Sequence, residues 1–302
     1  MEIFSTYSVK IKHYNHIFKE TVSLYREAVD FYIHVCLEHW DKVSQEKNSV
    51  KRVNILERFT HKTKKNPVAQ YPSFDQKFYK FPSYLRRSAI SEAFGKVSSY
   101  KSNLTNWEKE SVQTRGRQPS FPKAGSVYPA LYHTNMYQQI DIYEMKIKVF
   151  VRNTWDWLTV RVRKSDMDYI QKHCKNRRQC APTLQKRGRQ WFLDFPFEES
   201  VALSSTDISD QTIVAVDLGI ATVSVMRSDG TILGRHFCQL PREYDSLTHA
   251  VNRIKKAQQY GNRKTPRLWA RVKGINDDIS VKTAHFIMDV ALCYHADVIV
   301  FE

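Results

Sequence analysis

Cysteine is scarce in this sequence, and no two cysteines stand in a Cys-x-x-Cys pair. An odd, scattered set argues against a disulfide framework and for free thiols in a reducing compartment. His173, Cys174 and Cys180 lie close together, but their spacing fits no common zinc pattern, so we expect no zinc site in this chain. The five cysteines are Cys36, Cys174, Cys180, Cys238 and Cys293.

Long apolar runs are missing as well, and none approaches the roughly 20 residues that a membrane-spanning helix needs. The first residues lack the charged segment and apolar stretch of a signal peptide. The sequence has no internal repeat and no low-complexity tract. We therefore expect a cytoplasmic, nucleoid-associated protein with no membrane partner.

Acidic residues are in the minority: 31 Asp and Glu face 47 Lys and Arg, which gives a net charge of +16 and a pI of about 9.6. Residues 1–210 hold 35 basic and 22 acidic residues, whereas residues 211–302 hold 12 and 9. The excess suits nucleic acid, bound mainly by the front two-thirds, although a generally basic soluble protein is the alternative. With 302 residues and 42% hydrophobic content, two or three domains with real cores are expected.

The first 200 residues predict a β-rich unit that is interrupted by helices. Alternating patterns predict strands at 3–12, 140–149, 158–163 and 189–195. Apolar residues three or four apart predict helices from Val22 to Trp40, at 50–61 and from Ser83 to Trp107. Segments rich in proline, glycine or polar residues predict loops at 66–82 and 115–130 and a linker at 198–211.

A separate arrangement begins at residue 213. Ile213 to Ile220 predict an apolar strand that carries Asp217, and Asp229-Gly230 predicts a tight turn between two further strands. Helices are expected at about 243–260 and 268–294, before a last strand that ends in Glu302. This order is that of an RNase H-like fold, whose catalytic acids lie on the first strand, at the end of the fourth strand and on a later helix.

The chemistry of phosphodiester cleavage explains why acids stand at these places. Two divalent ions about 4 Å apart activate a water and stabilise the leaving oxygen, and magnesium prefers carboxylate ligands. Asp217 and Glu302 are therefore candidate catalytic and metal-binding residues. Each acid also has an ordinary explanation: Asp217 could be an acid in a turn, and Glu302 could be an exposed terminal residue.

The order of motifs resembles the TnpB family, the RNA-guided nucleases of insertion sequences that are related to type V CRISPR effectors. Ile-Val-Ala-Val-Asp-Leu-Gly-Ile (213–220) resembles the first RuvC motif of the family, and Ala-Asp-Val-Ile-Val-Phe-Glu (296–302) resembles the second. Further similar segments are Ser-Tyr-Leu-Arg-Arg-Ser-Ala-Ile (83–90), Gln-Pro-Ser-Phe-Pro-Lys (118–123), Leu-Pro-Arg-Glu (240–243), Arg-Ile-Lys-Lys-Ala-Gln (253–258) and Pro-Arg-Leu-Trp (266–269). The resemblance covers nearly the whole chain and is densest over 213–302.

The resemblance implies a multidomain α+β architecture. A wedge-type β-barrel (1–14 and 118–198) is split by a helical recognition domain (15–117), and a linker (199–211) leads to a partial RNase H-like (RuvC) α/β domain (212–302). The implied partners are a guide RNA from the end of the transposable element and target double-stranded DNA, with base pairing carrying most of the specificity. The implied cofactor is Mg²⁺, in a two-ion site of the complete protein to which Asp217 and Glu302 contribute.

Family members carry a further helical segment, a four-cysteine zinc module and a third catalytic Asp after the second motif, and the 302 residues hold none of these. We therefore expect a C-terminally truncated member that does not cleave DNA as it stands. Four other acids offer substitutes, although solvated acids on helices or a turn explain them better: Asp277, Asp278, Asp289 and Asp297.

Basic residues form three candidate contacts with nucleic acid. Arg86 and Arg87 are expected off the apolar stripe of their helix, toward the guide–target heteroduplex, and a basic loop toward guide RNA is expected from Lys172, Lys175, Arg177 and Arg178. The run from Val251 to Lys273 has no acid and either contacts phosphates or is a solvated face. Its cations are Arg253, Lys255, Lys256, Arg263, Lys264, Arg267, Arg271 and Lys273. Base stacking or core packing explains the aromatic residues Tyr71, Phe74, Phe78, Tyr79 and Phe81.

Three functions are compatible with these observations. The first is a TnpB-like RNA-guided DNA endonuclease that lacks its third acid and zinc module in this chain. The second is a cleavage-deficient RNA-guided repressor that keeps DNA binding. The third is an RNase H-fold transposase that works without RNA.

Overall fold

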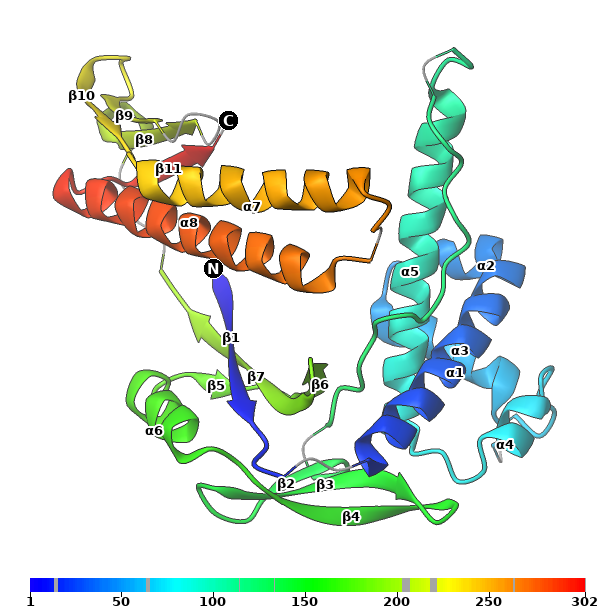
Figure 1. The fold of residues 1–302 in the computed structure, drawn as a ribbon. Coiled ribbons are helices and arrows are strands. Elements are labelled where there is room, and N and C mark those ends of the chain that lie inside the picture. The colour runs from blue at the N-terminus through cyan, green and yellow to red at the C-terminus, as the bar shows by residue number, and fades with distance from the viewer. Residues whose placement is uncertain are drawn as a thin grey trace. The chain divides into compact units, whose positions relative to one another are not determined.

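The computed structural model divides the chain into two compact units, Met1–Val201 (unit 1) and Ala202–Glu302 (unit 2) (Figure 1). It has mixed α and β structure with several antiparallel sheets. The structure describes residues 1–13, 16–63, 66–113, 115–132, 134–202, 207–217, 222–262 and 264–301. None of the helices in these ranges combines the length and the apolar character that crossing a membrane requires.

The first sheet of unit 1 joins the N-terminus to a strand nearly 200 residues later. β1 (Glu2–Lys10) pairs antiparallel with β7 (Gln190–Ser200), from Glu2 opposite Ser200 to Lys10 opposite Phe192. The other edge of β7 pairs with β5 (Arg178–Gln179) and β6 (Thr183–Arg187). Because β7 stays paired to Ser200, residues 199–200 belong to a strand and not to the expected linker.

The second sheet of unit 1 contains β2 (Tyr137–Gln139), β3 (Glu144–Val151) and β4 (Thr154–Arg161) in that order. The segment after β1 meets the end of β4 through a bridge between Ile11 and Val162. Its main chain is held there because the Arg163 N–H donates to the Lys10 carbonyl at 2.8 Å. A helix that the apolar spacing did not predict, α6 (Lys164–His173), follows β4 directly.

Five helices lie between β1 and β2 in the sequence: α1 (Ile17–Glu38), α2 (Trp40–Ser44), α3 (Ser49–Thr60), α4 (Ser73–Lys77) and α5 (Ser83–Lys109). The predicted stripes of α1 and α5 are confirmed, since Val22, Tyr25 and Ile33 of α1 and Ile90 and Val97 of α5 are buried.

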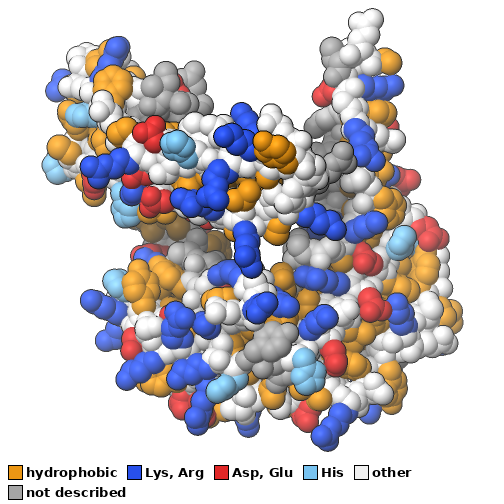
Figure 2. Space-filling view, viewed as in Figure 1, with side chains coloured by type: hydrophobic (Ala, Val, Ile, Leu, Met, Phe, Trp, Pro, Cys, Tyr) orange, Lys and Arg blue, Asp and Glu red, His pale blue; other side chains and the backbone are white. Residues whose placement is uncertain are grey.

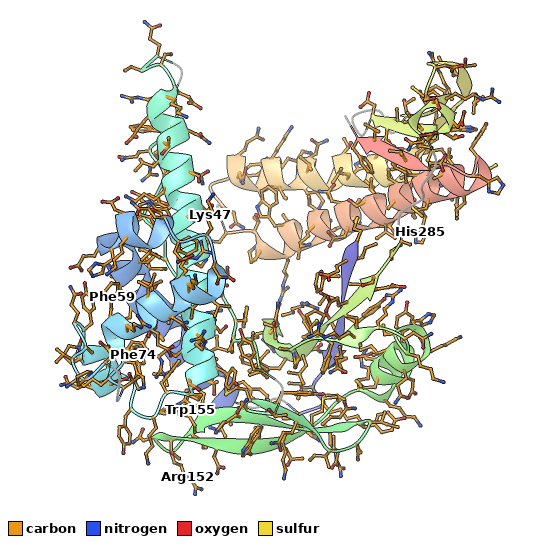
Figure 3. The ribbon with its side chains drawn as sticks, turned by 180° about the vertical axis from the view of Figure 1, so that it is seen from behind. Lys47, Phe59, Phe74, Arg152, Trp155 and His285 are labelled. Carbon is orange, nitrogen blue, oxygen red and sulfur yellow. The ribbon has the colours of Figure 1, made fainter. Side chains whose placement is uncertain are left out.

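Aromatic side chains fill the space around α4. Phe74, Phe78 and Phe81 are buried, and the rings of Phe74 and Phe78 lie 4.7 Å apart. Figure 3 labels Phe59 and Phe74 in this helical part and Trp155 on β4. Core packing is therefore confirmed for these three phenylalanines, whereas Tyr79 is 65% exposed.

Unit 2 places its strands in the order β10-β9-β8-β11. After a short 3-10 turn, η1 (Ile208–Asp210), β8 (Thr212–Asp217), β9 (Thr222–Arg227) and β10 (Ile232–Phe237) form an antiparallel meander. The predicted turn at Asp229-Gly230 is confirmed, with Gly230 at φ 87°, which glycine adopts without strain. Two long helices, α7 (Pro241–Gln259) and α8 (Pro266–Cys293), then lead to β11 (Val298–Phe301).

One face of the unit 2 sheet carries the core of this unit. Val214 and Val216 of β8 pack with Val223 and Val225 of β9 against a buried stripe of α8. The helical side of this core consists of Ile287, Val290 and Ala291. Alternation along β8 therefore directs every second residue toward α8 and the others, Asp217 among them, to the opposite face.

A buried ion pair ties α3 to α5. Arg86 donates from Nε to the Glu57 carboxylate at 2.9 Å, and Arg87 donates from Nη1 to the other carboxylate oxygen at 2.8 Å. Arg86 is 6% exposed and stands one turn before Ala89 and Ile90 on the buried face of α5. The expectation that Arg86 lies off the apolar stripe is therefore wrong, because Glu57 on a neighbouring helix compensates its charge inside the core.

Replacing Glu57 with Gln should lower the free energy of unfolding by about 3 kcal/mol, because Arg86 would keep a buried charge without its counter-ion. Urea unfolding followed by tryptophan fluorescence measures this, since five of the six tryptophans lie in unit 1. Glu27→Gln is the control: its pair with Lys77 is about half exposed, so a loss of no more than about 0.5 kcal/mol is expected. Equal losses in both variants would contradict the account of Arg86.

Candidate metal centre and nucleic-acid interface

Asp217 is the last residue of β8, where the strand is fixed on both sides. It pairs with Thr222 of β9, and the preceding residue, Val216, pairs with Phe301 of β11. The side chain is half-buried on the face of the sheet that α8 does not cover. A carboxylate in this place is held by the sheet, and hard divalent cations prefer oxygen ligands of this kind.

β11 is the parallel neighbour of β8. Its register runs from Val298 opposite Ile213 to Phe301 opposite Val216. Glu302, the second candidate ligand, lies outside the described residues. Within the described ranges, no group of three or more His, Cys, Asp or Glu side chains is arranged to hold a metal ion.

The four other acids of unit 2 have different surroundings. Asp277 pairs with Lys273 at 2.9 Å and Asp278 with Lys282 at 2.8 Å, each across one turn of α8. Asp297 accepts a hydrogen bond from the Thr212 N–H at 3.0 Å, at the end of β8 opposite to Asp217. Asp289 is exposed on α8. Asp277, Asp278 and Asp297 are therefore explained as solvated or structural acids. Their carboxylates bind lysine side chains or a backbone N–H at a distance from Asp217.

Lys282 links α8 to α7 as well. Hydrogen bonds from Lys282 to Asp278 and to Glu243 raise the pKa of its ammonium group. The same contact holds the pKa of Glu243 below its ordinary value. The paired cations of α8 are thus Lys273, the last residue of the acid-free run, and Lys282, which follows the run.

The acid-free run forms the end of the α7–α8 hairpin, where the helices pack through Ala250, Ile254 and Val272. Figure 2 shows Lys and Arg side chains along the visible face of these helices. Six cations of the run are exposed and make no ion pair within the described residues: Arg253, Lys255, Lys256, Lys264, Arg267 and Arg271. Lys273 pairs with Asp277, and Arg263 lies outside the described residues. Unpaired cations on one hairpin are suited to contact phosphates.

The other predicted cations are distributed differently. Arg86 and Arg87 are both bound to Glu57, so neither guanidinium is free for a phosphate. The expected basic loop is not one loop: Lys172 is in the last turn of α6 and Arg178 is in β5.

Ion pairs further divide this second group of cations. Arg177 pairs with Glu199 at 2.8 Å and Arg178 with Glu198 at 3.2 Å, because β7 runs alongside. Lys172 and Lys175 are exposed and have no ion pair among the described residues. The two lysines are therefore the members of this group that remain available to an anion.

Two aromatic residues at the hairpin end were not predicted as functional. Tyr260 is 89% exposed at the end of α7, and Trp269 is 54% exposed in the first turn of α8. Aromatic rings among unpaired cations favour contact with single-stranded nucleic acid. Both aromatic residues lie inside the acid-free run, and this position is the sequence feature that could have identified them as candidate contacts with nucleic acid.

Comparison with known proteins relates unit 1 to a sequence family. Residues 5–151 match the Aq_aa04 family. The chain is 33% identical over 124 residues to "Uncharacterized protein aq_aa04" of Aquifex aeolicus (strain VF5). This alignment covers 37% of the chain and 69% of the relative.

Comparison with solved structures gives matches of low sequence identity to chains of Cas12 complexes. The chain resembles a chain of the Cas12f1–sgRNA–target DNA complex, with 10% identity and a TM-score of 0.46, over 100% of this chain and 81% of that one. It also resembles a chain of the Cas12i–crRNA–dsDNA complex in the I1 state, with 11% identity and a TM-score of 0.25. That second match covers 82% of this chain and 37% of the Cas12i chain, so this chain spans well under half of its length.

Changing Arg253, Lys256, Lys264 and Arg271 together to Ala should weaken nucleic-acid binding for every sequence alike. Fewer counterions would be released, so the slope of log K against log salt should become shallower by about three to four. Fluorescence anisotropy at several salt concentrations measures both effects. The control is Lys273→Ala with Lys282→Ala, whose ammonium groups already pair with acids and whose loss should change the slope by less than about one. An unchanged slope in the fourfold variant would mean that this face is only solvated.

Proposed function

The chain belongs to the Aq_aa04 family, and we propose that it is an RNA-guided DNA-binding protein of the TnpB type with a RuvC-like nuclease domain in unit 2. The observation that carries the proposal is the pairing of β8 with β11. The two segments that resemble the first and second RuvC motifs are far apart in the sequence, yet they are parallel neighbours in one sheet. Asp217 ends one strand and Glu302 follows the other in the sequence.

Asp217 and Glu302 are the proposed magnesium ligands. Asp217 offers carboxylate oxygens from the end of a strand whose alternate side chains are buried under α8, so the sheet fixes its position. When bound, a pair of magnesium ions supplies an activated water and stabilises the oxygen that leaves in phosphodiester cleavage. The contribution of Asp217 is to hold such ions beside the edge strand β11.

Unit 1 is proposed to be the wedge domain with its helical recognition insert. The nine-residue register of β1 with β7 supports this, because the helices α1–α5 lie between these strands in the sequence. The bridge from Ile11 to Val162 supports a closed arrangement of the two sheets. Guide RNA is the proposed ligand of unit 1, and the unpaired cations of α7 and α8 are proposed to contact the phosphates of the guide or the target.

Purification of the protein after expression with its native locus should yield a discrete bound RNA that derives from that locus. The excess of basic over acidic residues in residues 1–210 motivates this expectation, and the RNA should be released as salt is raised. Sequencing of the bound RNA is the measurement. Random fragments of host RNA would contradict RNA guidance and favour a protein that works without RNA.

Asp217→Asn should remove a magnesium-dependent rise in melting temperature while leaving RNA binding within about twofold of the unchanged protein. The reason is that a ligand that binds only the folded state raises its stability by mass action, and Asn carries no charge to hold the ion. The control is Asp289→Asn, an exposed acid of the same unit. If both variants keep the magnesium response, Asp217 is not a ligand, and if the unchanged protein shows none, the metal site itself is wrong.

A further inference from the structure

Unit 1 contains a pocket of about 680 Å³ between the end of α6, β5, β2 and β7. No residue of the candidate nuclease centre contributes to it, since all of its lining residues lie between Gln139 and Phe197. The pocket surrounds the C-terminal end of α6 and the turn that follows. Its lining divides into cations, side-chain amides and an apolar floor, which suit the phosphate, the edge of the base and the face of the base in a nucleotide.

The cations of the pocket exceed its acids. Lys172, Lys175 and Arg177 line it, and Asp168 is the one acid among its lining residues. Asp168 already accepts a hydrogen bond from the Tyr143 hydroxyl at 2.9 Å, which raises the pKa of that phenol. Lys172 and Lys175 have no ion pair among the described residues. Two free ammonium groups at the rim are suited to a phosphate.

Arg177 makes the wall of the pocket rigid. Its Nε donates to Glu199 at 2.8 Å, and its Nη1 donates to the hydroxyls of Ser5 at 3.0 Å and Tyr7 at 3.2 Å. The turn itself is closed because the Arg177 N–H donates to the Cys174 carbonyl at 3.0 Å. The lysines on this turn and on the last turn of α6 therefore project from an ordered backbone.

Three glutamine side chains contribute the amides: Gln139, Gln171 and Gln179. Gln139 and Gln171 make no side-chain hydrogen bond within the described part of the chain. An amide has a carbonyl acceptor beside two N–H donors, and this combination pairs with the edge of a nucleobase. The amides of Gln139 and Gln171 are thus unused in the folded chain and chemically suited to read a base, whereas Gln179 hydrogen-bonds the side chain of Tyr137.

The floor of the pocket is apolar. Met167, Ile170 and Phe197 line it, and each is buried except for the few per cent of its surface that faces the pocket and solvent. Phe197 is fixed by the ring of Tyr7 at 5.9 Å. An apolar floor below hydrogen-bonding groups accepts the face of a base that has left its stack.

We propose that this pocket binds one unstacked nucleotide of a single-stranded RNA, with the base against the amides of Gln139 and Gln171 and the phosphate against Lys172 and Lys175. The inference rests on the proposed function, which supplies RNA as the partner. RNA is favoured over DNA because unpaired loops and ends are the usual targets of base-specific RNA recognition, whereas the proposed DNA target is a duplex. The pocket would give the protein a base preference in its guide RNA that phosphate contacts alone do not provide.

The test uses the full chain and labelled 12-nucleotide RNAs of each single base, with duplex RNA and single-stranded DNA of the same length. Gln139→Leu with Gln171→Leu should weaken binding of the preferred single-stranded RNA about tenfold, flatten the base preference and leave the salt slope unchanged. Lys172→Gln with Lys175→Gln should weaken binding of all four RNAs and make the slope shallower by about one. Gln113→Leu, an exposed glutamine outside the pocket, is the matched control.

The possible results distinguish a failure of the proposed function from a failure of the pocket assignment. If the unchanged protein binds no RNA, the proposed function fails, and the pocket assignment fails with it. If it binds RNA but the double glutamine variant keeps the same affinity and base preference, only the pocket assignment is wrong. Equal dependence on the glutamines with single-stranded DNA would overturn the assignment to RNA. Gln171→Glu, which preserves size and adds repulsion toward phosphate, repeats the test without an apolar substitution.

Discussion

The parallel pairing of β11 with β8 is the constraint on which the candidate nuclease centre depends. Parallel neighbours need a long crossover, and α7 and α8 provide it between β10 and β11. The core beneath β8 fixes which side chains face α8, and the alternation of the strand directs Asp217 to the other face. Without this pairing, the two motifs that carry acids would be separate segments with no common site.

The second organising feature is the distribution of unpaired charge. Both units contain many cations, but some are already paired: Arg86 and Arg87 of α5 with Glu57, Arg177 with Glu199 and Arg178 of β5 with Glu198. Exposed cations without an ion pair remain in two places among the described residues. One is the end of the α7–α8 hairpin, and the other is the pair of lysines that line the pocket beside α6. Net charge predicts a polyanionic partner, whereas the ion pairs indicate which surfaces are available to such a partner.

Periodicity predicted the long elements well, because α1, α5, α7 and α8 each carry a stripe that packs in a core. Periodicity did not predict features that depend on contacts with residues far away in the sequence. Arg86 looked like a surface cation until Glu57, on another helix, was found beside it. α6 was missed because it buries only Met167, Ile170 and the Cys174 that follows. The pocket glutamines were not predicted either, since three separate elements bring them together.

The central claim is that nucleic acid lies on the surfaces whose cations are unpaired. Ultraviolet crosslinking of the protein to its copurified RNA, followed by mass spectrometry of the crosslinked peptides, tests this claim most directly. The account predicts crosslinks in peptides from 164–179 and from 253–273, with the α3–α5 surface around Glu57 free of them. Crosslinks confined to the surface around Glu57, or absent from both predicted segments, would contradict it.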